Sequence, residues 1–227
     1  IPIRSEVGQL IRRGFVTEPG WTFLSADYSQ VELRILAHIS QDETLLRAFR
    51  EDQDIHTATA AAIYGIPVES VTKNQRRFAK TINFGLIYGM GAFRLARETG
   101  LTLGEAENYV KKYFGQFPGI ERYLDATRQK ARADGYVETL FGRRRYFPVF
   151  KTSMGSANRQ AAQRADREAV NHPIQGTAAD IIKVAMIRLH AELQARYRAR
   201  LLLQVHDELL LEVPLEELEA VRDLVVE

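Results

Sequence analysis

Two short apolar runs, near opposite ends of the chain, each lead into a carboxylate. The first, residues 23–26, ends at Asp27, and the second, residues 201–205, is followed by His206 and Asp207. Short apolar runs bounded by turn residues are typical of strands. The long stretch between them has mostly helical periodicity. The sequence therefore predicts an α+β fold, in which an antiparallel sheet built from both chain ends carries an inserted, mostly helical subdomain.

Apolar spacing and turn residues predict the individual elements. Gly65, Gly115 and Gly135 are expected to end helices, and Phe141-Gly142 is expected to form the turn of a hairpin. The expected ranges are a strand within 15–27, helices from 30 and over 43–49, several helices within 55–135, a loop over 151–158, a long helix beyond 171, strands within 200–213 and a helix over 218–227.

Composition limits the class of protein. The chain has 227 residues, no cysteine and a net charge of +2. It therefore has no disulfides and no thiolate metal sites, which is consistent with the cytoplasm. No apolar stretch is long enough to cross a membrane, and no signal-peptide pattern is present. Because the chain starts at Ile1, we expect it to be a fragment. The preference for arginine over lysine suggests a thermophile, although a GC-rich genome would give the same bias.

The two strand-end carboxylates, Asp27 and Asp207, are candidate metal ligands. A carboxylate at the end of an apolar strand is costly to bury unpaired, so it lies at an edge, in an ion pair or on a metal. Mg²⁺ suits such a site because it takes one or two carboxylates together with phosphate oxygens and water. A turn or capping role is the alternative for each residue taken alone.

Four side chains recur every fourth residue in the middle of the chain: Arg76, Lys80, Phe84 and Tyr88. This spacing places them along one face of a helix. The two cations could hold phosphate oxygens, and the two aromatic rings could stack on a base. The alternative is an ordinary amphipathic helix. Gly85 and Gly89 favour the ligand interpretation, because glycine near a helix end often marks a close approach or a bend.

Basic residues are concentrated in two regions of a nearly neutral chain. Residues 73–80 carry four cations and no anion, and residues 143–145 are three successive arginines followed by further cations up to Arg167. Such regions are compatible with a groove for a polyanion. A solvated helix face is the alternative.

Three longer segments contain these candidates: residues 25–34 (SADYSQVELR), 76–89 (RRFAKTINFGLIYG) and 204–208 (QVHDE). In this order they resemble motifs A, B and C of family A DNA polymerases, the bacterial DNA polymerase I group. The similarity extends from Ile1 to Glu227. One departure is the loop over 150–157, which is a few residues longer than in familiar members.

The resemblance implies roles for individual residues at the metal and nucleotide sites. Asp27 and Asp207 would hold two Mg²⁺ ions, with the Tyr28 carbonyl as a further ligand, and Glu208 would be a nearby acid. Lys80 would also be catalytic. The implied nucleotide-binding residues are Gln30, Glu32, His56, Arg76, Lys80, Phe84 and Tyr88.

Within that set, His56, Arg76 and Lys80 would hold the triphosphate of the incoming nucleotide. Phe84 would pack on its sugar and base, and Tyr88 would occupy the template-base position when the fingers open. Glu32 would lie at the 2′ position of the sugar, where it would exclude a hydroxyl. The implied DNA-binding residues near the primer terminus are Arg167, Asn171, Gln175 and His206.

The fold and function implied are those of the palm and fingers of a DNA polymerase. The palm would comprise residues 1–54 and 151–227, and the fingers residues 55–150. The partners would be primer-template DNA and dNTPs, with no membrane, and we expect a monomer in the bacterial cytoplasm, associated with the nucleoid. Two alternatives remain, a single-subunit phage-type RNA polymerase and a non-catalytic polymerase-like protein that binds nucleic acid. Glu32 and Phe84 argue against the first, and the paired aspartates argue against the second.

Overall fold

The structure is a computed structural model that describes residues 5–151 and 156–227. The chain forms two compact units. We call residues 1–29 and 179–227 the sheet unit and residues 30–178 the helical unit. The expected α+β class, with a small antiparallel sheet and a mostly helical remainder, is confirmed. The predicted palm and fingers ranges (1–54, 55–150 and 151–227) are functional divisions and stay a prediction.

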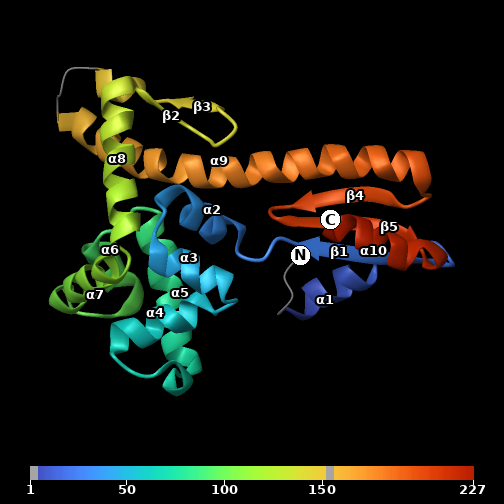
Figure 1. The fold of residues 1–227 in the computed structure, drawn as a ribbon, viewed down its shortest axis with the longest axis horizontal. Coiled ribbons are helices and arrows are strands. Elements are labelled where there is room, and N and C mark those ends of the chain that lie inside the picture. The colour runs from blue at the N-terminus through green and yellow to red at the C-terminus, as the bar shows by residue number, and fades with distance from the viewer. Residues whose placement is uncertain (1–4, 152–155) are drawn as a thin grey trace. The chain divides into compact units, whose positions relative to one another are not determined.

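The sheet unit is built on three antiparallel strands in the order β1-β5-β4. Its elements are α1 (Glu6–Arg13), β1 (Trp21–Asp27), β4 (Arg200–Val205), β5 (Glu208–Pro214), the short turn η3 (Leu215–Glu217) and α10 (Leu218–Val226), as Figure 1 shows. Asp27 pairs with Glu208, and Val205 pairs with Glu208 from the other side. The expected strand pairing between the two chain ends is therefore confirmed.

An apolar core stabilises the sheet unit. Alternate residues of β5 face the same side of the sheet because the side-chain period of a strand is two. They meet apolar side chains from α10 and from the part of α9 (Ser156–Arg196) that follows Ala178. The buried residues of this core are Ile182, Leu189, Leu193, Ala199, Leu209, Leu211, Val213 and Val221.

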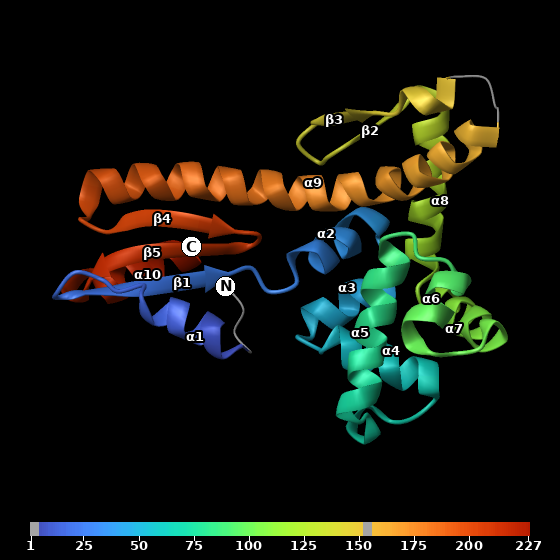
Figure 2. The same cartoon turned by 180° about the vertical axis from the view of Figure 1, so that it is seen from behind.

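The helical unit consists of short helices and one hairpin (Figure 2). The elements are α2 (Val31–Ser40), α3 (Glu43–Arg50), α4 (Ile55–Tyr64), η1 (Val68–Ser70), α5 (Lys73–Ile87), α6 (Ala92–Thr99), α7 (Leu103–Gln116), α8 (Pro118–Asp134), β2 (Tyr136–Glu138), β3 (Arg144–Tyr146), η2 (Pro148–Lys151) and the first part of α9. The expected hairpin and the helix that ends at Gly135 are confirmed.

Two expectations about helix ends were wrong. Gly115 lies inside α7, which ends at Gln116, because the chain turns only where Phe117 and Pro118 start the next helix. The long helix begins at Ser156 rather than beyond Asn171, and it contains Pro173. Residues 156–158 of the expected loop therefore belong to this helix, in which the buried Ala165 and Ala169 pack against Val137 and Phe147. Of the expected loop over 151–158, residues 152–155 lie outside the described residues.

The loop before α3 contains a buried carboxylate that sequence reasoning did not select. Asp42 is only 2% exposed. Its Oδ1 accepts a hydrogen bond from the Leu45 amide at 3.0 Å and caps α3. Its Oδ2 accepts from the Gly119 amide at 2.8 Å, at the start of α8. A Cβ on residue 119 would lie 2.8 Å from the Asp42 Cβ, so this approach requires glycine. Asp42 therefore joins α3 to α8.

None of the described helices is both long enough and apolar enough to span a membrane.

Candidate active site

The predicted metal ligands lie at one end of the sheet in the sheet unit. Asp27 is the last residue of β1, and the β4–β5 turn consists of His206 and Asp207. The Tyr28 amide donates a hydrogen bond to the Asp207 carbonyl at 3.1 Å. Because Asp27 also pairs with Glu208 in the sheet register, the structure brings these predicted residues together.

The charges at this end of the sheet repel one another. Loss of hydration, followed by the negative charges of Asp207 and Glu208, raises the pKa of Asp27 above its usual value. Ser25 Oγ donates a hydrogen bond to Glu208 Oε1 at 2.5 Å. Within the residues that the structure describes, no group of three or more His, Asp or Glu side chains is arranged to hold a metal ion. Carboxylates that repel one another nevertheless suit a hard divalent cation, because its charge offsets the repulsion and it binds one or two protein carboxylates.

His206 has an unusual backbone conformation. Its φ is 57°, in the left-handed region. Residues other than glycine occupy this region at a cost of roughly 1–2 kcal/mol. The conformation allows a tight turn between β4 and β5, so that Asp207 is held at the tip of the hairpin. Sequence patterning predicted the turn but could not predict which residue would carry the strain.

The predicted stripe follows α5 in the helical unit, and its last member, Tyr88, is the residue directly after that helix. A capping box between Thr72 and Gln75 begins this helix and fixes its register. The ring centroids of Phe84 and Tyr88 are 6.1 Å apart, and Lys80 Nζ lies 6.0 Å from the Phe84 ring centroid. The two cations at the start of the stripe are exposed and the two rings are half-buried. The expected line of cations and aromatic rings along one helix is confirmed, and the ligand-binding interpretation of this line stays a prediction beside the alternative of an ordinary amphipathic helix.

His56 joins this stripe from the neighbouring helix α4. Its ring centroid lies 5.7 Å from that of Phe84. Burial lowers the pKa of His56 below its usual value; the Asp54 carboxylate acts in the opposite direction, and the positive charges of Arg76 and Lys80 lower the pKa further. His56 is therefore neutral at neutral pH. The structure thus brings together a neutral imidazole and two exposed cations.

Asp54 organises this group, although sequence reasoning did not select it. Its Oδ1 accepts hydrogen bonds from the amides of His56 at 2.9 Å and Thr57 at 3.0 Å, and so caps α4. Its Oδ2 accepts from Arg76 Nε at 2.7 Å and lies 2.6 Å from Arg76 Nη2. Partial burial opposes the effect, but these hydrogen bonds and the charge of Arg76 lower the pKa of Asp54. An aspartate directly before an apolar helix was the sequence signal for the cap.

Asp54 leaves part of the Arg76 guanidinium available. A guanidinium has five N–H donors, and Asp54 engages Nε and Nη2 only. Asp54 therefore leaves the Nη1 edge unengaged, and such a donor edge matches the geometry of an anion such as phosphate. Since both side chains are more than a third exposed, the ion pair itself adds little to stability, on the order of 1 kcal/mol or less.

The predicted sugar-selecting residue contacts the end of the stripe. Glu32 on α2 accepts a hydrogen bond from the Tyr88 hydroxyl. Gln30, just before α2, has a φ of 55°. Its Oε1 is buried without a hydrogen-bond partner among the described residues. Gln30 is therefore a half-buried residue whose Oε1 has unused hydrogen-bonding capacity, two residues before Glu32 in the chain.

Glycine occupies residues 85 and 89 of this segment for different structural reasons. A Cβ on residue 85 would lie 2.8 Å from Met90 Cε, so Gly85 accommodates a side chain of the chain itself. Gly89 has a φ of 73° and lies against Arg167 of α9, whose Cγ would be 3.1 Å from an added Cβ. Of the two, Gly85 thus gives no support to the expected ligand approach, whereas Gly89 marks the bend after α5.

The predicted DNA-binding residues of the helical unit lie on α9. Arg167 and Gln175 are exposed, and Asn171 between them is half-buried. Their spacing of four places them on one face of the helix. The Asn171 Oδ1 is buried with no hydrogen-bond partner among the described residues. This face therefore combines an exposed cation with two amides.

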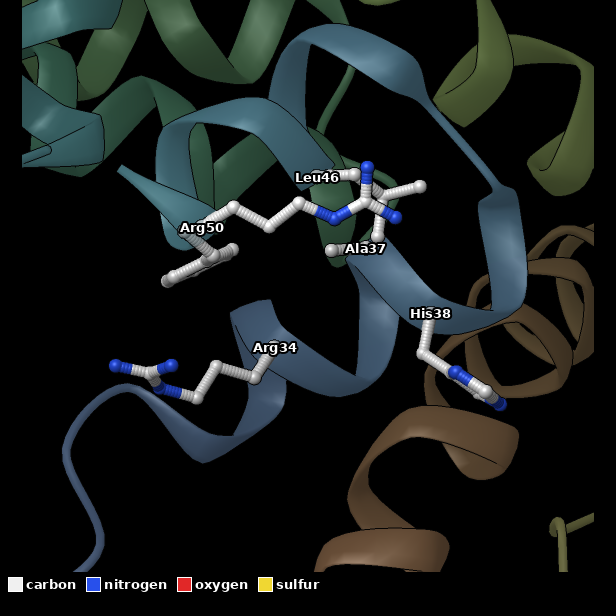
Figure 3. Close-up of a pocket in the computed structure, with 6 residues that line it drawn as sticks. Arg34, Ala37, His38, Leu46 and Arg50 are labelled. Atoms are coloured by element: carbon white, nitrogen blue, oxygen red, sulfur yellow. The ribbon is translucent and has the colours of Figure 1, made fainter. Parts of the chain in front are cut away.

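A pocket of about 240 Å³ lies between α2 and α3 (Figure 3). Arg34 and Arg50 border it, and the Arg34 guanidinium stacks on the Phe49 ring at 4.8 Å. In Figure 3 the two guanidinium groups point in opposite directions, and His38 points away from both. The charges do not converge on a common point, and none of the predicted site residues lines the pocket.

The predicted site residues fall into two groups, one in each unit. Those of the sheet unit are Asp27, Tyr28, His206, Asp207 and Glu208. Those of the helical unit are Gln30, Glu32, His56, Arg76, Lys80, Phe84, Tyr88, Arg167, Asn171 and Gln175. The structure describes the geometry within each group, and the functional role of each residue stays a prediction.

Comparisons with known proteins agree on one family. The model of DNA polymerase family A matches residues 1–227. The chain is 54% identical over 220 residues to DNA polymerase I of Chloroflexus aurantiacus, covering 96% of this chain and 23% of that protein. It is 50% identical over 227 residues to the thermostable DNA polymerase I of Thermus aquaticus, covering 100% of this chain and 27% of that protein.

A solved structure gives the same result. The POL domain of Pol1 from M. smegmatis, in complex with DNA primer-template and dNTP, is 44% identical and superposes with a TM-score of 0.91. The match covers 99% of this chain and 39% of that chain. The chain spans about a quarter of the length of the curated relatives it matches.

Proposed function

Because the chain belongs to DNA polymerase family A, we propose that it carries the catalytic residues of a template-directed DNA polymerase. The observation that carries this proposal is the cluster of neutral His56, Arg76, Lys80 and Phe84 in the helical unit. It offers hydrogen-bond donors and positive charge to a polyphosphate, and an aromatic face to a sugar or base. The reaction would be attack of a primer 3′-hydroxyl on the α-phosphate of a dNTP, with release of pyrophosphate.

Two Mg²⁺ ions would complete the site. Asp27 and Asp207 would hold them, with the Tyr28 carbonyl as a further ligand and Glu208 nearby. Bound divalent ions stabilise the charge that develops on the attacking and leaving oxygens of such a displacement. The donor set fits, since hard carboxylate and carbonyl oxygens are the ligands that Mg²⁺ prefers.

The chain's own residues would bind and orient the nucleotide. Arg76 would present its Nη1 edge to the triphosphate while Asp54 holds the opposite edge. Lys80 would add a point charge beside Phe84 and contribute to catalysis there. Catalysis would then come mainly from positioning and from charge stabilisation in a fixed site.

The partners and domain roles follow from the same proposal. Primer-template DNA would contact Arg167, Asn171 and Gln175 on α9, and His206 at the β4–β5 turn would support the primer end. Tyr88 would occupy the template-base position when the fingers open. Residues 1–54 and 151–227 would act as palm and residues 55–150 as fingers. We also propose a monomer that acts in the bacterial cytoplasm at the nucleoid.

Primer extension by the complete protein tests this function. The assay uses a defined template with Mg²⁺ and compares dNTPs with rNTPs. We expect extension with dNTPs in the order that the template specifies. Extension with rNTPs at a similar rate would favour a phage-type RNA polymerase. DNA binding without extension would favour a non-catalytic binding protein.

Glu32→Ala is expected to relax sugar selection. Removing the carboxylate opens space at the 2′ position of the sugar. The preference for dNTPs over rNTPs should therefore fall by about 10- to 200-fold, which is the range of discrimination that one misfitting group produces in a binding pocket. Single-nucleotide incorporation with matched dNTP and rNTP measures this preference. Tyr88→Phe is the control, because it removes the hydroxyl that donates to Glu32 but keeps the carboxylate. Unchanged selectivity in Glu32→Ala would contradict the assignment.

Phe84→Tyr is expected to ease incorporation of dideoxynucleotides, as the family resemblance suggests. A hydroxyl on this ring can replace a hydrogen-bonding group that a dideoxy sugar lacks, which should raise the ddNTP-to-dNTP ratio by about tenfold. Chain-termination frequency on one template measures the ratio. Phe78→Tyr, on the same helix but packed against Tyr64 and Tyr109, should leave the ratio unchanged. Equal ratios for Phe84→Tyr and the parent protein would refute this role for Phe84.

A further inference from the structure

Three buried polar side chains form a chain of hydrogen bonds between α4 and α5. Thr59 is 0% exposed, Asn83 is 2% exposed and His56 is 3% exposed. Asn83 Nδ2 lies 3.1 Å from Thr59 Oγ1 and 3.0 Å from His56 Nδ1. The two helices run beside each other in Figures 1 and 2. A buried polar chain of this kind constrains each member, because an unpaired buried donor is costly.

The Ile55 carbonyl determines where the Thr59 hydroxyl donates its proton. Thr59 Oγ1 lies 2.7 Å from the Ile55 carbonyl oxygen. A carbonyl can only accept, so the single Thr59 hydroxyl proton donates to Ile55. The contact between Thr59 Oγ1 and Asn83 Oδ1 is longer, at 3.2 Å. The Thr59 oxygen is therefore left as an acceptor for the amide of Asn83.

The amide of Asn83 then determines which imidazole nitrogen carries the proton. With Nδ2 facing both neighbours, one of its protons donates to Thr59 Oγ1 and the other to His56 Nδ1. The flipped amide would leave one buried N–H without an acceptor, and buried N–H groups without partners are rare in folded proteins. His56 Nδ1 is therefore the acceptor, and the ring proton lies on Nε2.

The Nε2 of His56 forms no hydrogen bond with any residue in the described part of the chain. The charged groups that influence the ring are Asp54, which precedes α4, and Arg76 and Lys80 on α5. Burial together with the two cations lowers the pKa of His56, although Asp54 opposes this effect. The ring is thus a neutral donor beside the two cations of the stripe.

We propose that Thr59 and Asn83 are positioning residues, which hold His56 as the Nε2–H tautomer so that it donates a hydrogen bond to a phosphate oxygen of the incoming nucleotide. The proposal rests on the proposed polymerase function. Phosphate oxygens only accept hydrogen bonds, so the other neutral tautomer would place a lone pair against them. Thr59 and Asn83 would act on nucleotide binding without touching the nucleotide.

The first test compares two substitutions of Thr59 in the complete protein. Thr59→Val keeps the shape but removes the hydroxyl, so Asn83 loses the acceptor that fixes its orientation. The KM for dNTP should rise about threefold to tenfold, the effect of losing one neutral hydrogen bond, with a smaller change in kcat. Thr59→Ser keeps the hydroxyl and should restore the KM of the parent protein.

The second test uses Asn83→Asp and the pH dependence of KM. A carboxylate at this position accepts from His56 Nδ1–H and raises the pKa of the ring. At low pH the imidazolium keeps its Nε2–H. As pH rises through the raised pKa of His56, the Nε2 proton is lost and the remaining ring proton stays on Nδ1. The ratio of the variant's KM to that of the parent protein should therefore rise with pH. The double variant His56→Ala/Asn83→Asp should give no such rise relative to His56→Ala.

The outcomes separate this proposal from the polymerase assignment. Extension by the parent protein is measured first, and its failure would overturn the function. If extension is normal, equal KM values for Thr59→Val and Thr59→Ser would overturn the positioning role. A KM ratio for Asn83→Asp that is independent of pH would also overturn it. If Asn83→Asp does not fold because of the buried charge, the Thr59 pair decides the question.

Discussion

Asp27→Ala in the complete protein should reduce the rate of nucleotide incorporation by at least about 10³-fold, because under the proposed function Asp27 would hold a divalent ion that supplies several kcal/mol of charge stabilisation. The affinity for primer-template DNA should change by less than about threefold. Asp27 is exposed at the end of β1 and makes no packing contribution to the core of the sheet unit. A single-turnover incorporation assay and a DNA-binding titration, made on the same preparation, measure the two quantities.

The control for this experiment is a second exposed aspartate of the same unit. Asp223 on α10 pairs with Arg222 at the surface. Asp223→Ala should leave both the rate and the affinity close to those of the parent protein. Substantial incorporation by Asp27→Ala in Mg²⁺ would contradict the metal assignment. An equal loss in both variants would indicate a general effect of charge.

Asp42→Ala should lower the free energy of unfolding by about 2–4 kcal/mol. The substitution removes the cap of α3, worth about 0.5–2 kcal/mol, and leaves the buried Gly119 amide without its acceptor, which costs about 1–3 kcal/mol. In a unit of this size, the midpoint of thermal unfolding should fall by roughly 5–15 °C. Calorimetry or urea titration of the complete protein measures the change.

Two further variants define the source of this effect. Asp42→Asn retains one side-chain oxygen and can replace only one of the two hydrogen bonds, so its effect should be intermediate. Glu43→Ala removes the neighbouring exposed carboxylate and should cost less than about 1 kcal/mol. An effect of Asp42→Ala no larger than that of Glu43→Ala would refute the bridging role.

The fold was predictable where local pattern decides it. The short apolar runs predicted strands, the glycine at residue 135 predicted a helix end, and the four-residue spacing of the stripe predicted a helix. Family resemblance supplied the roles of residues such as Glu32 and His56. Residues 156–158 were expected in a loop and no element was expected over 159–170, because this part of α9 is stabilised by packing of Ala165 and Ala169 against a distant hairpin, which composition cannot reveal.

The rest of the site depends on contacts between residues that are far apart in sequence. Asp54 caps α4 and also holds Arg76, and only the first of these functions has a local signature. In the sequence, Asn83 is a single polar residue within motif B. Its hydrogen-bond partners lie on another helix. Gly85 was interpreted as a sign of a ligand, but Met90 occupies the space beside it. Such partners become visible only when the helices are packed.

The most direct test of polymerase function is incorporation of a single nucleotide opposite each of the four template bases, by the complete protein with Mg²⁺. We expect the complementary dNTP to be added to the primer 3′ end in each case, with release of pyrophosphate, and the corresponding rNTP to be rejected. Addition that does not depend on the template base, or no addition by a folded protein that binds the primer-template, would contradict this function.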